Sequence, residues 1–214
     1  VDGAVQYTWT TNGVTYGALG LDGVDDYMDC GDIEAIDTAT SLTVSAWVYH
    51  DDLDDDDTIV CKFEKVGSPA YDGFVLWRDD AAFVSGRSET YSVSLQEHGT
   101  TDFATLEGTT GASQVQSWTH VCAVITLGSA TGLRLYVNGV EDANSPVSTT
   151  TISDIDAGSE PVYVGETFEV TASNKRFDGL IDEVRIYPTA LSSNEVYNLY
   201  LGPNSTNLTI YGHN

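Results

Sequence analysis

Hydrophobic and polar residues alternate one by one in many short stretches of this chain. From residue 42 to residue 48 every second side chain is apolar, with Thr, Ser and Trp between them. A period of two places successive side chains on opposite faces of a β-strand. Further strand-like segments, separated by Gly, Pro or Asn-Gly turn signals, lie at residues 14–21, 58–64, 71–78, 91–95, 118–126 and 133–137. The pattern predicts many short antiparallel strands.

A helical pattern occurs once, at residues 192–200. Ser192 and Glu195 have the spacing of a capping box, and Gly202-Pro203 ends the helix. Many strands and one short C-terminal helix predict an all-β, two-sheet antiparallel jelly-roll sandwich. With 41% hydrophobic residues, the 214-residue chain can build one large domain, expected over residues 1–202, before a polar C-terminal tail at 203–214.

The stretch at residues 177–187 alternates strictly and has a carboxylate in register with its apolar side chains. Leu180, Val184 and Ile186 fall on one face, and Asp182 lies among them. A buried carboxylate without a cation or hydrogen-bond donors costs several kcal/mol. The sequence therefore predicts a partner for Asp182.

The charge of the chain is strongly negative. Its 33 Asp and Glu residues against 8 Lys and Arg give a formal net charge of -25. Such a chain repels nucleic acid and anionic membranes, and no apolar run is long enough for direct membrane insertion. Because salt screens self-repulsion, we expect a halophilic protein adapted to concentrated salt. The alternative is an ordinary acidic extracellular domain whose carboxylates bind Ca²⁺.

Two further features concern local chemistry. The acid run at residues 51–57 predicts a solvated loop, because like charges oppose packing. Cys30, Cys61 and Cys122 lack metal-site spacing, and the last two lie in apolar runs. Cys61 and Cys122 are therefore expected to be buried free thiols.

Four segments, in this order, resemble the laminin-G-like, concanavalin-A-like jelly-roll domain family between about residues 14 and 201. They are residues 21–27 (LDGVDDY), residues 42–48 (LTVSAWV), residues 118–121 with 135–139, and residues 179–187 (GLIDEVRIY) with 190–192 and Glu195. This fold is shared by lectins, adhesion modules, glycanase accessory domains and enzymes, so the resemblance implies the fold more than the function.

The resemblance also implies a partner for Asp182. In such domains a structural Ca²⁺ often joins the early turn to the late strand. By position this implicates Asp22, Asp25 and Asp182, with Asp26 and Asp178 as further candidate ligands. The alternative is a metal-free site in which Asp182 accepts backbone N–H bonds from the turn at Gly23.

The chemistry of glycan cleavage is not evident in the sequence. Retaining glycosidases of this fold need alternating carboxylates on one strand, which gives a separation of about 5 Å. No strand carries such a pattern, and the His residues lack a nucleophile motif. We therefore expect a noncatalytic protein, with a glycan hydrolase or lyase as a less favoured alternative.

Sugar recognition needs flat aromatic rings beside hydrogen-bonding groups. Candidates from the middle strands are Tyr71, Trp77, Arg78, Arg87 and Tyr91. The competing interpretation is that Trp77 packs in the core and that the two arginines pair with acidic residues.

The favoured function is a carbohydrate-binding or adhesion module on a cell or virion surface, with a surface glycan or glycoprotein as partner. The N-glycosylation sequons at Asn204 and Asn207 agree with an extracellular location. The alternative is a structural virion-decoration or filament subunit, which would need a homo-oligomer or assembly partner.

Overall fold

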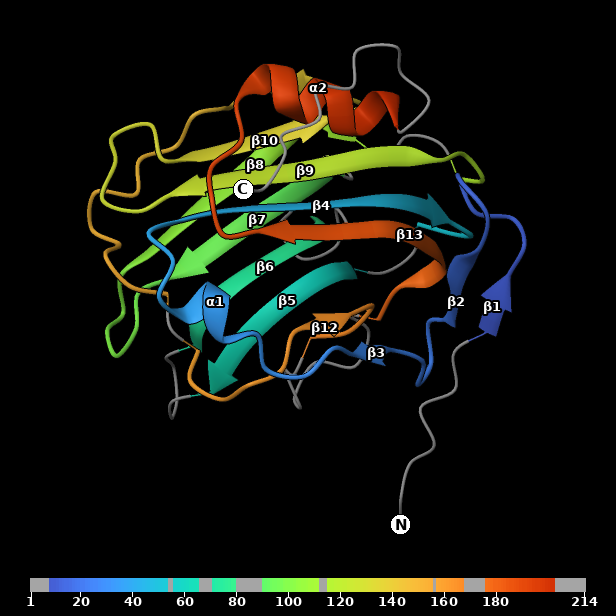
Figure 1. Cartoon of the computed structure of the whole chain (residues 1–214), viewed down its shortest axis with the longest axis horizontal. Helices are drawn as coiled ribbons and strands as arrows, with labels where there is room; N and C mark the ends of the chain where they lie inside the picture. The colour runs from blue at the N-terminus through green and yellow to red at the C-terminus, as the bar shows by residue number, and fades with distance from the viewer. Residues whose placement is uncertain are drawn as a thin grey trace, which may run out of the picture.

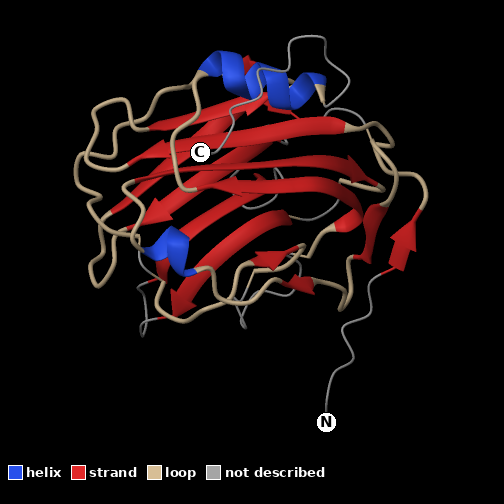
Figure 2. Cartoon of the chain, viewed as in Figure 1, coloured by secondary structure: helices blue, strands red, loops and turns tan. Residues whose placement is uncertain are grey.

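The computed structural model describes residues 8–53, 56–65, 71–79, 90–111, 115–155, 157–167 and 176–202. Two antiparallel sheets pack in layers, as the jelly-roll prediction requires (Figures 1 and 2). The seven-stranded sheet has the order β1 (Thr8–Thr10), β2 (Ala18–Asp22), β13 (Asp178–Tyr187), β4 (Ser41–His50), β9 (Thr119–Thr126), β10 (Leu133–Val137) and β11 (Val140–Glu141). The six-stranded sheet has the order β3 (Met28–Asp29), β12 (Tyr163–Val164), β5 (Asp57–Lys65), β6 (Tyr71–Asp79), β7 (Thr90–Gln96) and β8 (Phe103–Gly111).

The core lies between the sheets, where alternate residues of each strand meet. The apolar residues of β4, from Leu42 to Val48, are fully buried, which confirms the alternation seen in the sequence. Cys61 and Cys122 are buried free thiols, also as expected. The predicted glycosylation sites Asn204 and Asn207 lie outside the described residues.

Two helices accompany the sheets. The predicted C-terminal helix is α2 (Ser193–Leu201), and its capping box between Ser192 and Glu195 is present. Val196 of α2 packs on Cys122 and Tyr136, which lie on the outer face of the seven-stranded sheet. The hydrophobic pattern did not predict the one-turn helix α1 (Glu34–Asp37). In the described part of the chain, neither helix combines the length and apolarity needed to cross a membrane.

Strand β13 contains a bulge that corrects the predicted assignment of its faces. Asp182 lies opposite Trp47 of β4, whereas Arg185 lies opposite Ser45, so β13 carries one extra residue. Glu183 accommodates it with a φ of 50°. Because a shift of one residue exchanges the faces of a strand, Ile181 rather than Leu180 enters the core.

A polar network is buried inside the sandwich. Asp57 is 2% exposed, so it belongs to the interior and not to the predicted solvated loop. Its Oδ2 accepts a hydrogen bond of 2.9 Å from Arg78 Nε and lies 2.8 Å from His50 Nδ1. The Tyr91 hydroxyl lies 3.2 Å from His50 Nε2. Removing the side chain of Asp57 or Arg78 would break this buried ion pair, at a typical cost of about 3–5 kcal/mol.

A second buried histidine lies under α2. The His120 ring lies 5.3 Å from the Trp47 ring and 6.2 Å from the Tyr200 ring. Its Nδ1 is buried and has no hydrogen-bond partner among the described residues. Burial, and then the charge of Arg185, lower the pKa of His120 to about 4.

The low pKa of His120 predicts acid sensitivity. Since an unfolded histidine titrates near 6.5, the unfolded chain binds a proton that the folded chain excludes. The free energy of unfolding should therefore fall as pH drops from about 6.5 to about 4, by about 3 kcal/mol more in the wild type than in His120→Phe. Chemical denaturation across this pH range measures the difference. Parallel curves for the two proteins would contradict it.

Candidate functional site

The outer face of the six-stranded sheet brings one predicted ligand-binding residue together with polar side chains. Phe74 and Leu76 of β6 are buried in the core, so Val75 and Trp77, which alternate with them, face outward. Trp77 is half-buried and lies opposite Ser92 of β7. On its other side, Ser92 lies opposite Glu107 of β8.

The neighbouring rows of this face add hydroxyl groups and one further aromatic ring. Val75 lies opposite Ser94, which lies opposite Thr105, and the two hydroxyl groups are 2.6 Å apart. In the next row Gln96 of β7 lies opposite Phe103 of β8, whose side chain is 69% exposed. The face therefore combines apolar rings with hydrogen-bonding side chains.

Two other predicted ligand-binding residues lie inside the protein. Arg78 and Tyr91 are both 0% exposed and belong to the network around Asp57, so neither can contact a ligand on the outer face. The alternation of β6 could have shown this, because the adjacent residues Trp77 and Arg78 must face opposite ways. The Tyr71 side chain and Arg87 lie outside the described residues.

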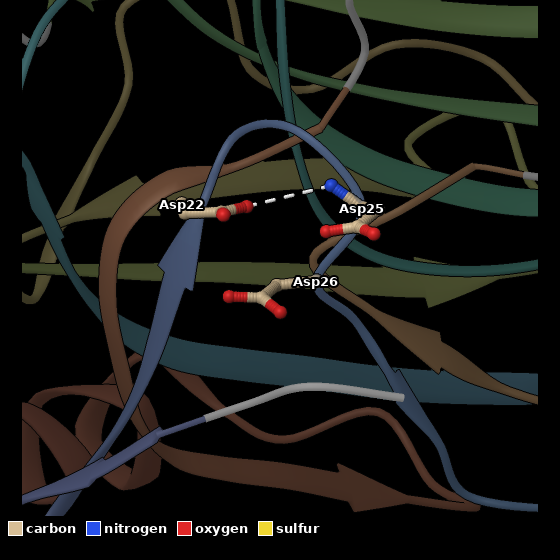
Figure 3. A group of neighbouring side chains, drawn as sticks. All are labelled: Asp22, Asp25 and Asp26. Atoms are coloured by element: carbon tan, nitrogen blue, oxygen red, sulfur yellow. Dashed lines mark hydrogen bonds between the residues drawn. The ribbon is translucent and has the colours of Figure 1, made fainter. Parts of the chain in front are cut away.

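A cluster of carboxylates forms where β2 ends. Asp22, Asp25 and Asp26 each place an oxygen within 4.8 Å of the others, as Figure 3 illustrates. Gly23 has a φ of 69°, which permits the tight turn after β2. Asp22 Oδ1 accepts hydrogen bonds from the N–H groups of Val24, at 2.9 Å, and Asp25, at 3.4 Å.

Asp26 is the buried member of this cluster. It is 6% exposed, and its Oδ1 is buried without a hydrogen-bond partner in the described part of the chain. Burial, followed by the charges of Asp22 and Asp25, raises its pKa. A cation would reverse these effects, and oxygen ligands are those that Ca²⁺ prefers. The residues at this turn therefore fit the Ca²⁺ ion that the resemblance implied.

The structure corrects the prediction that Asp182 is a calcium ligand together with Asp22 and Asp25. The strand register places Asp178, not Asp182, opposite Asp22. Asp182 is four residues further along β13, which corresponds to about 13 Å of strand. Burial, and then the charges of Asp52 and Asp51, raise the pKa of Asp178, so it belongs to the same crowded acidic end.

Asp182 accepts hydrogen bonds from backbone groups. Its Oδ2 accepts hydrogen bonds from the N–H groups of Val14, at 2.8 Å, and Thr15, at 3.4 Å, and its Oδ1 accepts one of 2.7 Å from Glu183 N. This matches the metal-free alternative for Asp182, except that the donors come from residues 14, 15 and 183 and not from the Gly23 turn.

Comparison with known families agrees with the architecture. The family model described as the concanavalin A-like lectin/glucanases superfamily matches residues 22–197. This chain belongs to that superfamily. The match begins at Asp22 of the acidic turn and ends within α2, so it spans both sheets of the superfamily domain.

Solved structures share the fold at low sequence identity. Domain 4 of AbnA, a GH43 extracellular arabinanase from Geobacillus stearothermophilus in complex with arabinotriose, has a TM-score of 0.64 at 20% identity, over 91% of this chain and 81% of that one. The CBM40 of the Ruminococcus gnavus IT-sialidase, bound to α2,3-sialyllactose, has a TM-score of 0.60 at 14% identity, over 91% and 98%.

A third similar structure is an oligomer. The native heptameric SAP-like pentraxin from Limulus polyphemus has a TM-score of 0.61 at 14% identity, over 85% of this chain and 80% of that one. A search of curated protein sequences finds no match. At these sequence identities, the similarity to the three solved structures shows a shared fold and nothing more specific.

The acidic turn predicts a stabilising effect of calcium. Ca²⁺ at about 100 times its Kd should raise the melting temperature by about 5–10 °C. Asp26→Asn should remove most of this increment, and it should raise the melting temperature measured in chelator, because it relieves the repulsion from Asp22 and Asp25. Thermal melts in Ca²⁺ and in chelator measure both effects.

Asp182→Ala is the matched control for this experiment. It should lower the melting temperature equally with and without Ca²⁺, because it removes the acceptor for Val14 and Thr15. The same increment in Asp26→Asn as in the wild type would exclude the acidic turn as the calcium site.

Proposed function

We propose that this domain is a noncatalytic carbohydrate-binding module that holds glycans on the outer face of the six-stranded sheet. The observation that carries the proposal is the outward, half-buried Trp77 on the same face as Glu107 and the partly exposed hydroxyl groups of Ser94 and Thr105. A sugar ring offers one apolar face and a rim of hydroxyl groups, so an indole beside hydroxyl and carboxylate groups complements it.

Membership of the superfamily and its similar structures support this class of ligand. Domain 4 of AbnA was seen with arabinotriose, and the sialidase CBM40 was seen with α2,3-sialyllactose. These sugars are the first probes for this chain. The sequence identities are too low to favour one sugar over the other. A binding role is preferred to cleavage because no strand of the sequence carries alternating carboxylates at retaining-glycosidase spacing.

We place the module outside the cell or on a virion surface, in concentrated salt and with Ca²⁺ at the acidic turn. The formal net charge of -25 supports the salt adaptation, because self-repulsion of this size weakens the compact state. Burial, followed by the charges of neighbouring Asp residues, raises the pKa values of Asp26 and Asp178, so carboxylates repel one another at the end of the sandwich where β2 ends and β13 begins.

Glycan binding should depend on Trp77. A glycan array that includes arabino-oligosaccharides and sialyllactose, probed in Ca²⁺ and molar NaCl, should show binding. Trp77→Ala should lower the affinity for the best ligand by about tenfold or more, which corresponds to a loss of about 1.4 kcal/mol in binding free energy. Tyr16→Ala, which removes an 87% exposed aromatic ring from the β1–β2 loop, should bind as the wild type does.

The absence of binding to any glycan on the array would count against a carbohydrate-binding role. Equal loss in Trp77→Ala and Tyr16→Ala would count against the outer face of the six-stranded sheet as the site.

Stability should increase with salt. Between about 0.1 M and 1 M NaCl the Debye length falls from about 10 Å to about 3 Å, which screens repulsion between exposed carboxylates. The melting temperature, measured with Ca²⁺ held constant, should therefore rise over this range. A flat curve would refute adaptation to salt.

A further inference from the structure

The outer face of the six-stranded sheet is covered at β5 and open from β6 to β8. Cys61 of β5 lies opposite Val75 of β6, so the two side chains share this face. Cys61 is nevertheless 0% exposed, and its Sγ donates a hydrogen bond of 3.0 Å to the carbonyl oxygen of Glu166. On the other side, β8 is the last strand of the sheet in the described part of the chain. A ligand that contacts Trp77 on β6 therefore has room to extend across β7 and β8, but not across β5.

A second aromatic ring lies at the far edge of this open part. Ala104 and Leu106 of β8 are buried in the core, so Phe103 and Thr105, which alternate with them, face outward. Phe103 is 69% exposed, and it is the only exposed large apolar residue among the described residues of the six-stranded sheet. The open face thus has one aromatic ring on β6 and another on its edge strand.

The two rings are too far apart for a single sugar to contact both. Ser92, the partner of Trp77 on β7, and Gln96, the partner of Phe103, are four residues apart on the same strand. Four residues correspond to about 13 Å along a strand, and the step from β6 to β8 adds about 10 Å across the sheet, which gives about 16 Å between the backbone positions of Trp77 and Phe103. A single sugar ring is no wider than about one strand spacing, about 5 Å, so it can contact only one of the two aromatic side chains.

Hydroxyl groups occupy the interval between the two rings. Ser94 on β7 and Thr105 on β8 lie in the row midway between those of Trp77 and Phe103, and both residues are half-buried. Their hydroxyl oxygens are 2.6 Å apart. Because one hydroxyl donates to the other, the pair keeps one O–H donor and several lone pairs for a ligand. This order of ring, hydroxyl pair and ring fits a chain of sugars in which the outer units stack and the middle units form hydrogen bonds.

We infer that this face binds an extended glycan of about three or four sugar residues, and that Phe103 makes binding depend on the length of the glycan. The inference rests on the proposed glycan-binding function and adds its substrate class, a linear oligosaccharide rather than a single terminal sugar. One sugar would stack on Trp77, the next would contact the hydroxyl pair of Ser94 and Thr105, and the last would stack on Phe103.

Isothermal titration calorimetry with sugars of increasing length tests the inference. The probes are arabino-, xylo-, cello- and manno-oligosaccharides, each from the monosaccharide to the hexasaccharide, together with sialyllactose, all in Ca²⁺ and molar NaCl. In a series that binds, the affinity should rise about tenfold or more from the disaccharide to the tetrasaccharide and then level off, because the tetrasaccharide already reaches Phe103.

Variants connect the length dependence to Phe103. Phe103→Ala should lower the affinity for the tetrasaccharide by about fivefold or more and leave that for the disaccharide unchanged, because a disaccharide on Trp77 does not reach β8. Phe103→Tyr keeps the ring and should bind both lengths as the wild type does. Trp77→Ala should weaken both lengths, whereas Val140→Ala, at a 67% exposed residue of β11 in the other sheet, should weaken neither.

Equal affinity for the disaccharide and the tetrasaccharide would overturn the inference and leave the proposed function standing. The same holds if Phe103→Ala binds the tetrasaccharide as the wild type does, or loses affinity equally for both lengths. Binding of sialyllactose or another array glycan, with no binding in any of the four series, would also overturn it. If no sugar binds in the array or in the titrations, the proposed function fails and the inference fails with it.

Discussion

The carboxylate of Asp57 joins the two sheets inside the sandwich. One oxygen, Oδ2, lies within hydrogen-bond distance of His50 on β4 and of Arg78 on β6, so strands of opposite sheets share the same acceptor. Charges removed from water together are tolerated only in close contact. Arg78 must therefore face inward, and Trp77, its neighbour on β6, must face outward. The interior pairing decides which side chains the six-stranded sheet offers to a ligand.

The acidic end of the sandwich follows from strand pairing. Asp178 begins β13 and lies opposite Asp22, the last residue of β2, and Asp51 and Asp52 follow β4 nearby. Segments far apart in the sequence thus bring carboxylates into one region, where burial, and then the neighbouring negative charges, raise the pKa values of Asp26 and Asp178. A bound cation and a concentrated salt solution both relieve this repulsion, the first locally and the second over the whole surface.

The bulge at Glu183 decides which residues of β13 face the core. It lets Ile181 and, beyond the extra residue, Val184 and Ile186 all pack toward the core. It also leaves Asp182 close to the backbone of residues 14 and 15, which holds the β1–β2 connection beside β13.

The sequence by itself determined the all-β class, the buried face of β4, the buried thiols of Cys61 and Cys122, and the capped helix α2. Each of these depends on a local period or a local spacing, which the chain carries whatever its partners are. The tertiary structure decided the place of Asp57, Asp182 and Arg78. Asp57 belongs to an acid run that looks solvated, and only the cation supplied by β6 makes its burial favourable. The alternation of β13 alone placed Asp182 on the core face. A bulge is one extra residue relative to a partner strand, so the sequence of one strand cannot reveal it, and it changes which residues face the core.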